Sequence, residues 1–105
     1  MMFRRRRFAD VVFRQLDVFA EDEAGGLLEE VREMKQRYDE ADRDGAEEAY
    51  GDYTDVVEAA TEALADMRDR YARTLEEDAA EEYEKAFNHA VKRRWPPFGL
   101  EIENR

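Results

Sequence analysis

Residues 50–74 read YGDYTDVVEAATEALADMRDRYART, and apolar side chains recur along this stretch at intervals of three and four. Two interleaved series with seven-residue spacing make up the pattern: Tyr50, Val57, Leu64 and Tyr71, and, three places further on, Tyr53, Ala60 and Met67. On an α-helix this spacing places both series on one side. Charged residues fill most of the remaining positions, so the stripe must be covered by other helices of this chain or of a second copy.

The segment before this stripe also has a helical pattern. A first helix is predicted over residues 6–20, because four large apolar side chains share one face: Phe8, Val12, Leu16 and Phe19. Phe13 lies to one side of that face. The segment is apolar around much of its circumference, so we expect this helix to be the most buried one.

Two adjacent glycines, Gly25 and Gly26, follow the first helix. Each glycine inside a helix costs about 1 kcal/mol relative to alanine, which favours a break at this point. The three-four spacing nevertheless continues through the glycines, so a single bent helix over residues 6–43 is the alternative. In either case residues 27–41 form an amphipathic helix.

Three further signals mark where the later helices begin and end. Gly45 suits the left-handed conformation that often ends a helix. Asp78 is positioned to cap the last helix, with Glu81 three residues later as in a capping box. Pro96 and Pro97 end that helix. The tail after them is too short for independent structure, and its apolar residues alternate, which favours an extended segment lying along a groove: Phe98, Leu100 and Ile102.

These segments predict an all-α fold, a small antiparallel helical bundle of three to four helices with a long amphipathic helix around residues 46–75. Residues 1–5 are a basic N-terminal arm, residues 6–95 the bundle, and residues 96–105 a C-terminal tail. A chain of 105 residues buries only about 60–70% of its unfolded surface, so its core is small. We therefore expect a second subunit to complete the core.

The composition limits the cellular compartments and the classes of partner to be expected. The net charge is −11, so most of the surface repels nucleic acids and anionic membranes. Cysteine is absent, which excludes disulfides and thiolate metal sites and fits a reducing compartment. No apolar run reaches the roughly 20 residues of a membrane span, and Asp10 and Arg14 interrupt the segment where a signal peptide would be apolar. We expect a cytoplasmic protein.

No residue pattern in the chain predicts catalysis. His89 is the only histidine, and Ala86 stands where a di-metal helical bundle has glutamate. The chain has no serine to act as a nucleophile. Carboxylates at four-residue spacing could gather Mg²⁺ or Ca²⁺ weakly, although a solvated helix face is the favoured interpretation: Glu58, Glu62 and Asp66. We therefore predict no enzyme activity, no cofactor and no metal site.

Two basic clusters stand out against the acidic background. The candidate anion-binding residues are Arg4, Arg5, Arg6, Arg7, Arg93 and Arg94. The favoured interpretation of the N-terminal run is an arm that pairs with acidic residues, and weak binding to nucleic acid or lipid phosphate is the alternative. A break at Gly25 and Gly26 predicts that the first and last helices run in opposite directions, which would join both clusters beside Trp95. A continuous first helix would leave two smaller patches.

The patterns favour a small cytoplasmic interaction or assembly module that associates with itself as a homodimer. The candidate interface residues come from the first helix and from the stripe: Phe8, Val12, Tyr50, Tyr53, Val57, Leu64, Met67 and Tyr71. The tyrosines fit a core or a dimer seam better than a ligand cleft. A different protein partner, a carboxylate-rich metal-binding bundle and an arginine-armed adaptor for an anionic partner are the alternatives.

Overall fold

Every regular element in the described part of the chain is helical, which confirms the all-α fold. The computed structural model describes residues 7–21 and 25–105. Its elements are the α-helices α2 (Ala9–Glu21), α3 (Gly25–Glu40), α4 (Ala46–Ala72), α5 (Glu77–Arg94) and α6 (Gly99–Glu103), with the 3₁₀-helix η1 (Pro96–Phe98) between the last two.

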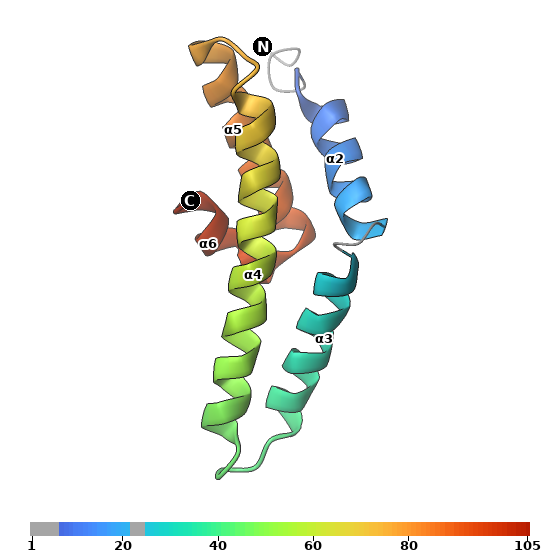
Figure 1. The fold of residues 1–105 in the computed structure, drawn as a ribbon, viewed down its shortest axis with the longest axis vertical. Helices are drawn as coiled ribbons and strands as arrows, with labels where there is room; N and C mark the ends of the chain where they lie inside the picture. Colours follow the sequence, from blue (N-terminus) through green and yellow to red (C-terminus); the bar gives the residue numbers. More distant parts are fainter. Residues whose placement is uncertain (1–6, 22–24) are drawn as a thin grey trace.

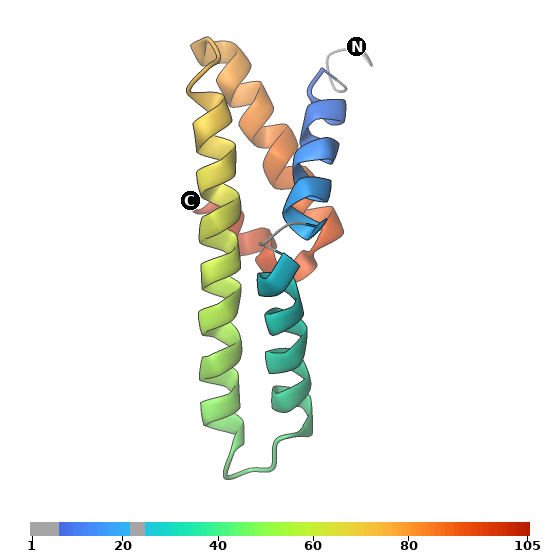
Figure 2. The same ribbon diagram turned by 45° about the vertical axis from the view of Figure 1, so that its right-hand side comes forward.

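The long helix α4 sets the shape of the molecule, which measures 51 × 24 × 23 Å along its principal axes. α3 lies beside the N-terminal part of α4, and α5 packs against its C-terminal part (Figure 1). α2 packs on α5 and follows the same general course as α3, so that α2 and α3 succeed one another along the length of the molecule (Figure 2). One end therefore contains three helices, and the other contains only the pair α3 and α4.

The core is concentrated at the three-helix end. Four large side chains point inward, as the sequence pattern predicts: Phe8, just before α2, and Val12, Leu16 and Phe19 on α2. They meet the buried face of α5, which comprises Tyr83, Phe87 and Val91. The Phe8 and Tyr83 rings meet edge to face with their centroids 5.5 Å apart, and such aromatic pairs add stability beyond the area they bury.

The stripe on α4 is buried in its middle, partly buried at Met67 and Tyr71, and exposed at its start. Val57, Ala60 and Leu64 are buried, as the seven-residue spacing predicts. Tyr50 is 52% exposed, because only α3 lies beside this end of α4. The buried face is also broader than the predicted stripe and includes two polar residues, Thr61 and Arg68. The Thr61 hydroxyl donates a hydrogen bond of 2.7 Å to the Val57 carbonyl, which satisfies it within the helix.

Arg68 is a buried cation that joins three helices. Its Nη1 donates to the side-chain oxygen of Asn88 on α5 at 2.9 Å and to the carbonyl oxygen of Ile102 on α6 at 3.0 Å. Its Nε donates to the neighbouring Asp69 carboxylate at 2.8 Å. A buried charge is costly unless it is paired and hydrogen-bonded, and these three partners meet that requirement.

The C-terminal tail is folded, which corrects the expectation of an extended segment. Residues 96–103 form η1 and α6 and pack against α4 and α5. Phe98 and Ile102 are buried, whereas Leu100 is 76% exposed. The four-residue spacing of the two buried residues matches one face of a helix, so the pattern that reads as alternation in an extended chain is a single helical turn. With α6 and the separate α2 and α3, the described residues contain five α-helices rather than three to four.

Three of the predictions concern the ends of helices. One described helix ends at Glu21 and the next begins at Gly25. The choice between a break and a single bent helix falls on residues 22–24, which lie outside the described part of the chain. Gly45 has a φ of −95°, not the left-handed value, and it precedes α4 as its N-cap. The helix predicted to be the last is α5, which begins at Glu77 with Glu76 as N-cap, so the prediction of Asp78 as the cap is wrong. Asp78 lies in the first turn instead, where the helix dipole still favours its charge.

Candidate interaction surface

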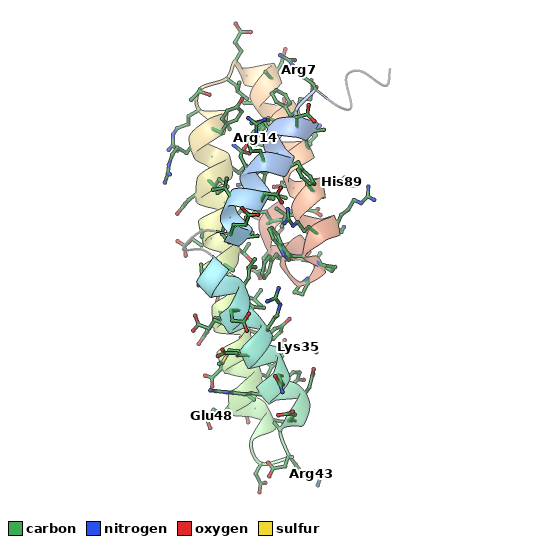
Figure 3. All side chains as sticks on the ribbon, turned by 90° about the vertical axis from the view of Figure 1, so that its right-hand side faces the viewer. Arg7, Arg14, Lys35, Arg43, Glu48 and His89 are labelled. Atoms are coloured by element: carbon green, nitrogen blue, oxygen red, sulfur yellow. The ribbon has the colours of Figure 1, made fainter. Side chains whose placement is uncertain are left out.

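A groove of about 550 Å³ lies between α2 and α5. Its floor is apolar and its rim carries charged and polar groups. The lining residues are Ala9, Val12, Phe13, Leu16 and Asp17 on α2, and Ala86, His89, Ala90, Arg93 and Arg94 on α5. We call this surface the α2/α5 groove. In Figure 3, His89 lies on α5 on the side that faces α2.

The groove follows from how α2 packs. Because α2 points the face containing Val12 and Leu16 at α5, the side chain of Phe13 is turned about 100° away and remains 65% exposed. On the α5 side the groove is lined at this height by Ala86 and Ala90, whose small side chains leave the hollow unfilled. A large exposed aromatic ring therefore stands beside a shallow apolar recess, which is typical of a surface that docks a helix.

α2 and α5 run in the same direction, and two ion pairs show it. Arg7, just before α2, lies 3.7 Å from Glu82 in the early part of α5. Asp17, late in α2, lies 2.8 Å from Arg94 at the end of α5. Phe13 and the two alanines of the groove thus lie at about the same level, near the midpoint between these pairs.

This common direction contradicts the prediction that a break near Gly25 would join the two basic clusters. The prediction assumed that α3 folds back beside α2, whereas α3 continues along the molecule. Arg7 and Arg94 consequently lie at opposite ends of the α2–α5 pair, each paired with a carboxylate. Arg7 is therefore not part of the single basic patch that was predicted beside Trp95. Arg4, Arg5 and Arg6 lie outside the described residues.

The basic residues at the C-terminal end of the groove differ in how tightly they are held. The guanidinium of Arg94 pairs with Asp17 and also lies 4.9 Å from the centroid of the Trp95 ring, in cation–π geometry. Arg93 is exposed and forms no ion pair with another described residue. Arg93 is therefore the cation that the groove offers to a partner.

The structure divides the predicted interface residues into two groups. Phe8, Val12, Val57 and Leu64 lie in the core of the single chain. Residues of the second group are partly buried or exposed: Tyr50, Tyr53, Met67 and Tyr71. None of the eight except Val12 lines the α2/α5 groove. The side chain that dominates the groove, Phe13, was missed, because its position off the predicted buried face suggested no role.

The tyrosines form two separate clusters. Tyr38, Tyr50 and Tyr53 meet at the two-helix end, where the rings of Tyr38 and Tyr53 are nearly parallel at 6.5 Å and those of Tyr38 and Tyr50 lie 5.3 Å apart. Tyr71 and Tyr83 pack together in the core at 4.7 Å. The hydroxyl of Tyr83 donates to the side-chain oxygen of Gln15 at 2.7 Å. Burial raises the pKa of Tyr83 from 10.0 to about 12, because the charged form would be poorly solvated there.

Neither the carboxylates nor His89 form an evident metal site in the described part of the chain. Among residues 7–21 and 25–105, no group of three or more metal-ligating side chains is close enough to hold an ion. Glu58, Glu62 and Asp66 are each exposed on α4. His89 is exposed at the edge of the groove.

Comparison of the chain with protein-family models, with curated proteins and with solved structures finds no match in any of the three. None of the helices in the described residues is both long enough and apolar enough to span a membrane. Functional assignment therefore rests on the surface of the molecule itself.

Proposed function

We propose that this protein is a small cytoplasmic assembly module, without enzyme activity, that forms a homodimer through the α2/α5 groove. The single observation that carries the proposal is the exposed ring of Phe13 beside the apolar recess at Ala86 and Ala90. An apolar groove with a charged rim is the kind of surface that another helix covers. In such a dimer the helices of both copies would form a larger bundle, and the second copy would add to the small core of the single chain.

The size of the groove indicates how strong such a dimer would be. A 13-residue helix is about 20 Å long, and two packed helices present a face about 20 Å wide. The contact would bury about 800 Å² in total, which is below the roughly 1,200 Å² of stable specific interfaces and in the range of weak, transient ones. We expect a dissociation constant in the micromolar range, on the order of 10 μM, so association should depend strongly on concentration.

Sedimentation equilibrium between about 1 and 500 μM tests this proposal. We expect a reversible monomer–dimer equilibrium, which Phe13→Glu should weaken at least 30-fold because the interface would bury an unpaired carboxylate. Phe13 is exposed in the monomer, so its replacement should leave the fold intact. Val18→Glu is the matched control, because Val18 is a 50% exposed apolar residue on α2 that lies outside the groove.

A chain that stays monomeric up to 500 μM would overturn the homodimer proposal. Equal weakening by the Phe13→Glu and Val18→Glu variants would also overturn the assignment of the groove. For the alternative of an arginine-armed adaptor, Arg7 and Arg94 are each already paired with a carboxylate, and Arg93 is the one described arginine of the two clusters without an ion pair to another described residue.

A further inference from the structure

The α2/α5 groove contains enough detail to indicate how a second copy would be oriented on it. This inference rests on the proposed homodimer and adds the direction of its two-fold axis. Two faces built from a helix pair can stack in two symmetric ways. In one, the axis runs along the helices, and α2 of each copy lies over α5 of the other. In the other, the axis runs across the helices, and α2 lies over α2.

The shapes of the two helices differ in a way that favours the first arrangement. α2 contributes the large ring of Phe13, whereas α5 contributes the small side chains of Ala86 and Ala90 at the same level. With the axis along the helices, each phenylalanine ring would lie over the alanines of the other copy. Large and small residues facing one another fill a helical layer without voids. With the axis across the helices, the two rings would instead meet each other, and the alanines would face alanines.

The charges favour the same arrangement. Asp17 on α2 and Arg93 on α5 both line the C-terminal end of the groove. With the axis along the helices, Asp17 of one copy would lie level with Arg93 of the other. Each Asp17 would then have Arg94 of its own chain, at 2.8 Å, and the second copy's Arg93 as partners. Opposite charges placed in register across an interface fix the orientation of the partners.

We propose that two copies associate around a two-fold axis parallel to α2 and α5, with α2 of each copy on α5 of the other. The resulting layer contains four helices that all run in the same direction. Phe13 of each copy seats on Ala86 and Ala90 of the second copy, and Arg93 of each copy faces the second copy's Asp17.

Disulfide trapping can test the orientation, because the chain contains no cysteine. Ala9→Cys and Ala86→Cys are conservative in size, lie on the two sides of the groove and leave Phe13 in place. The two single variants are mixed at about 200 μM, one of them isotopically labelled, and oxidised mildly. Because a disulfide needs Cα atoms within about 7 Å, we expect the mixed dimer, cross-linked between positions 9 and 86, to exceed either homodimeric product at least fivefold.

Two matched controls make the result decisive. Val18→Cys mixed with Ala86→Cys should give little mixed product, since Val18 lies outside the groove. His89→Cys alone should also give little product, because the proposed axis places the two copies of α5 diagonally across the layer. With the axis across the helices, the two copies of position 89 would face one another and cross-link readily.

The outcomes separate this inference from the proposal beneath it. Efficient homodimers of the His89→Cys variant, or a Val18→Cys control as reactive as Ala9→Cys, would overturn the orientation while sedimentation still showed a dimer. A chain that sediments as a monomer at 500 μM would instead remove the homodimer itself. A dominant mixed product of Ala9→Cys with Ala86→Cys, together with a sedimenting dimer, supports both.

Discussion

Tyr83 illustrates how a single polar atom is tolerated in the core. Its ring is buried among Phe8, Tyr71 and Phe87, and its hydroxyl reaches the side chain of Gln15. The ring therefore contributes apolar area, while the hydroxyl has a partner that prevents the cost of an unsatisfied buried group. The same burial that stabilises the neutral ring makes this position sensitive to high pH.

We expect the free energy of unfolding to fall as the pH rises from about 10 to about 12. The pKa of Tyr83 is raised to about 12 in the folded chain, so the unfolded chain loses this proton first. The stabilisation is complete below pH 10 and is lost as the pH approaches 12. Urea unfolding across this range should show a shallower pH dependence for Tyr83→Phe than for the natural chain. Identical slopes for the two proteins would contradict the assignment.

Among the helices, α6 shows how five residues can stay folded. A helix this short is unstable alone, because too few hydrogen bonds offset the cost of starting it. Here Ile102 and the preceding Phe98 are buried, and Arg68 donates a hydrogen bond to the Ile102 carbonyl. Ion pairs from Lys92 to Glu103 and from Arg105 to Glu58 lie at the surface, where such pairs contribute less.

Replacing Ile102 by alanine should destabilise the protein by about 2–4 kcal/mol, the usual range for a large aliphatic side chain deleted from a core. Leu100→Ala is the matched control within the same helix, because Leu100 is largely exposed. Its effect should stay within about 0.5 kcal/mol. Urea unfolding at 25 °C measures both. Equal effects would mean that α6 does not pack through Ile102.

The sequence predicts the helices more reliably than it predicts their contacts. The inward face of α2 and the end of α5 before Pro96 follow from local patterns, and the structure confirms both. The role of Phe13 depends on which helix packs against α2. Whether the two basic clusters lie together depends on the direction of α3 relative to α2. Arg68 reads as one more charged residue on an amphipathic helix, because its partners on α5 and α6 are 20 and 34 residues away.

For the molecule as a whole, the net charge of −11 should reduce stability at low ionic strength. Raising the salt concentration from 10 to 300 mM shortens the screening length from about 30 Å to about 6 Å, which weakens repulsion among the carboxylates. We expect the melting temperature to rise by about 4 °C or more over this range. The rise should be smaller at pH 5, nearer the isoelectric point of about 4.6. An unchanged melting temperature at neutral pH would contradict this.

The pairing of α2 with α5 has a consequence for the order in which the chain folds. α3 and α4 are neighbours in sequence, so their contacts require only the short turn at residues 41–45 to form. The contacts of the inward face of α2 cannot form until α5 is present, and α5 follows α2 in the chain only after residues 22–76. Long-range contacts of this kind form late, and a nascent chain on the ribosome would carry α2 uncovered until α5 emerges. We expect chains that stop before α5 to depend on chaperones, because the phenylalanines of α2 would have no cover.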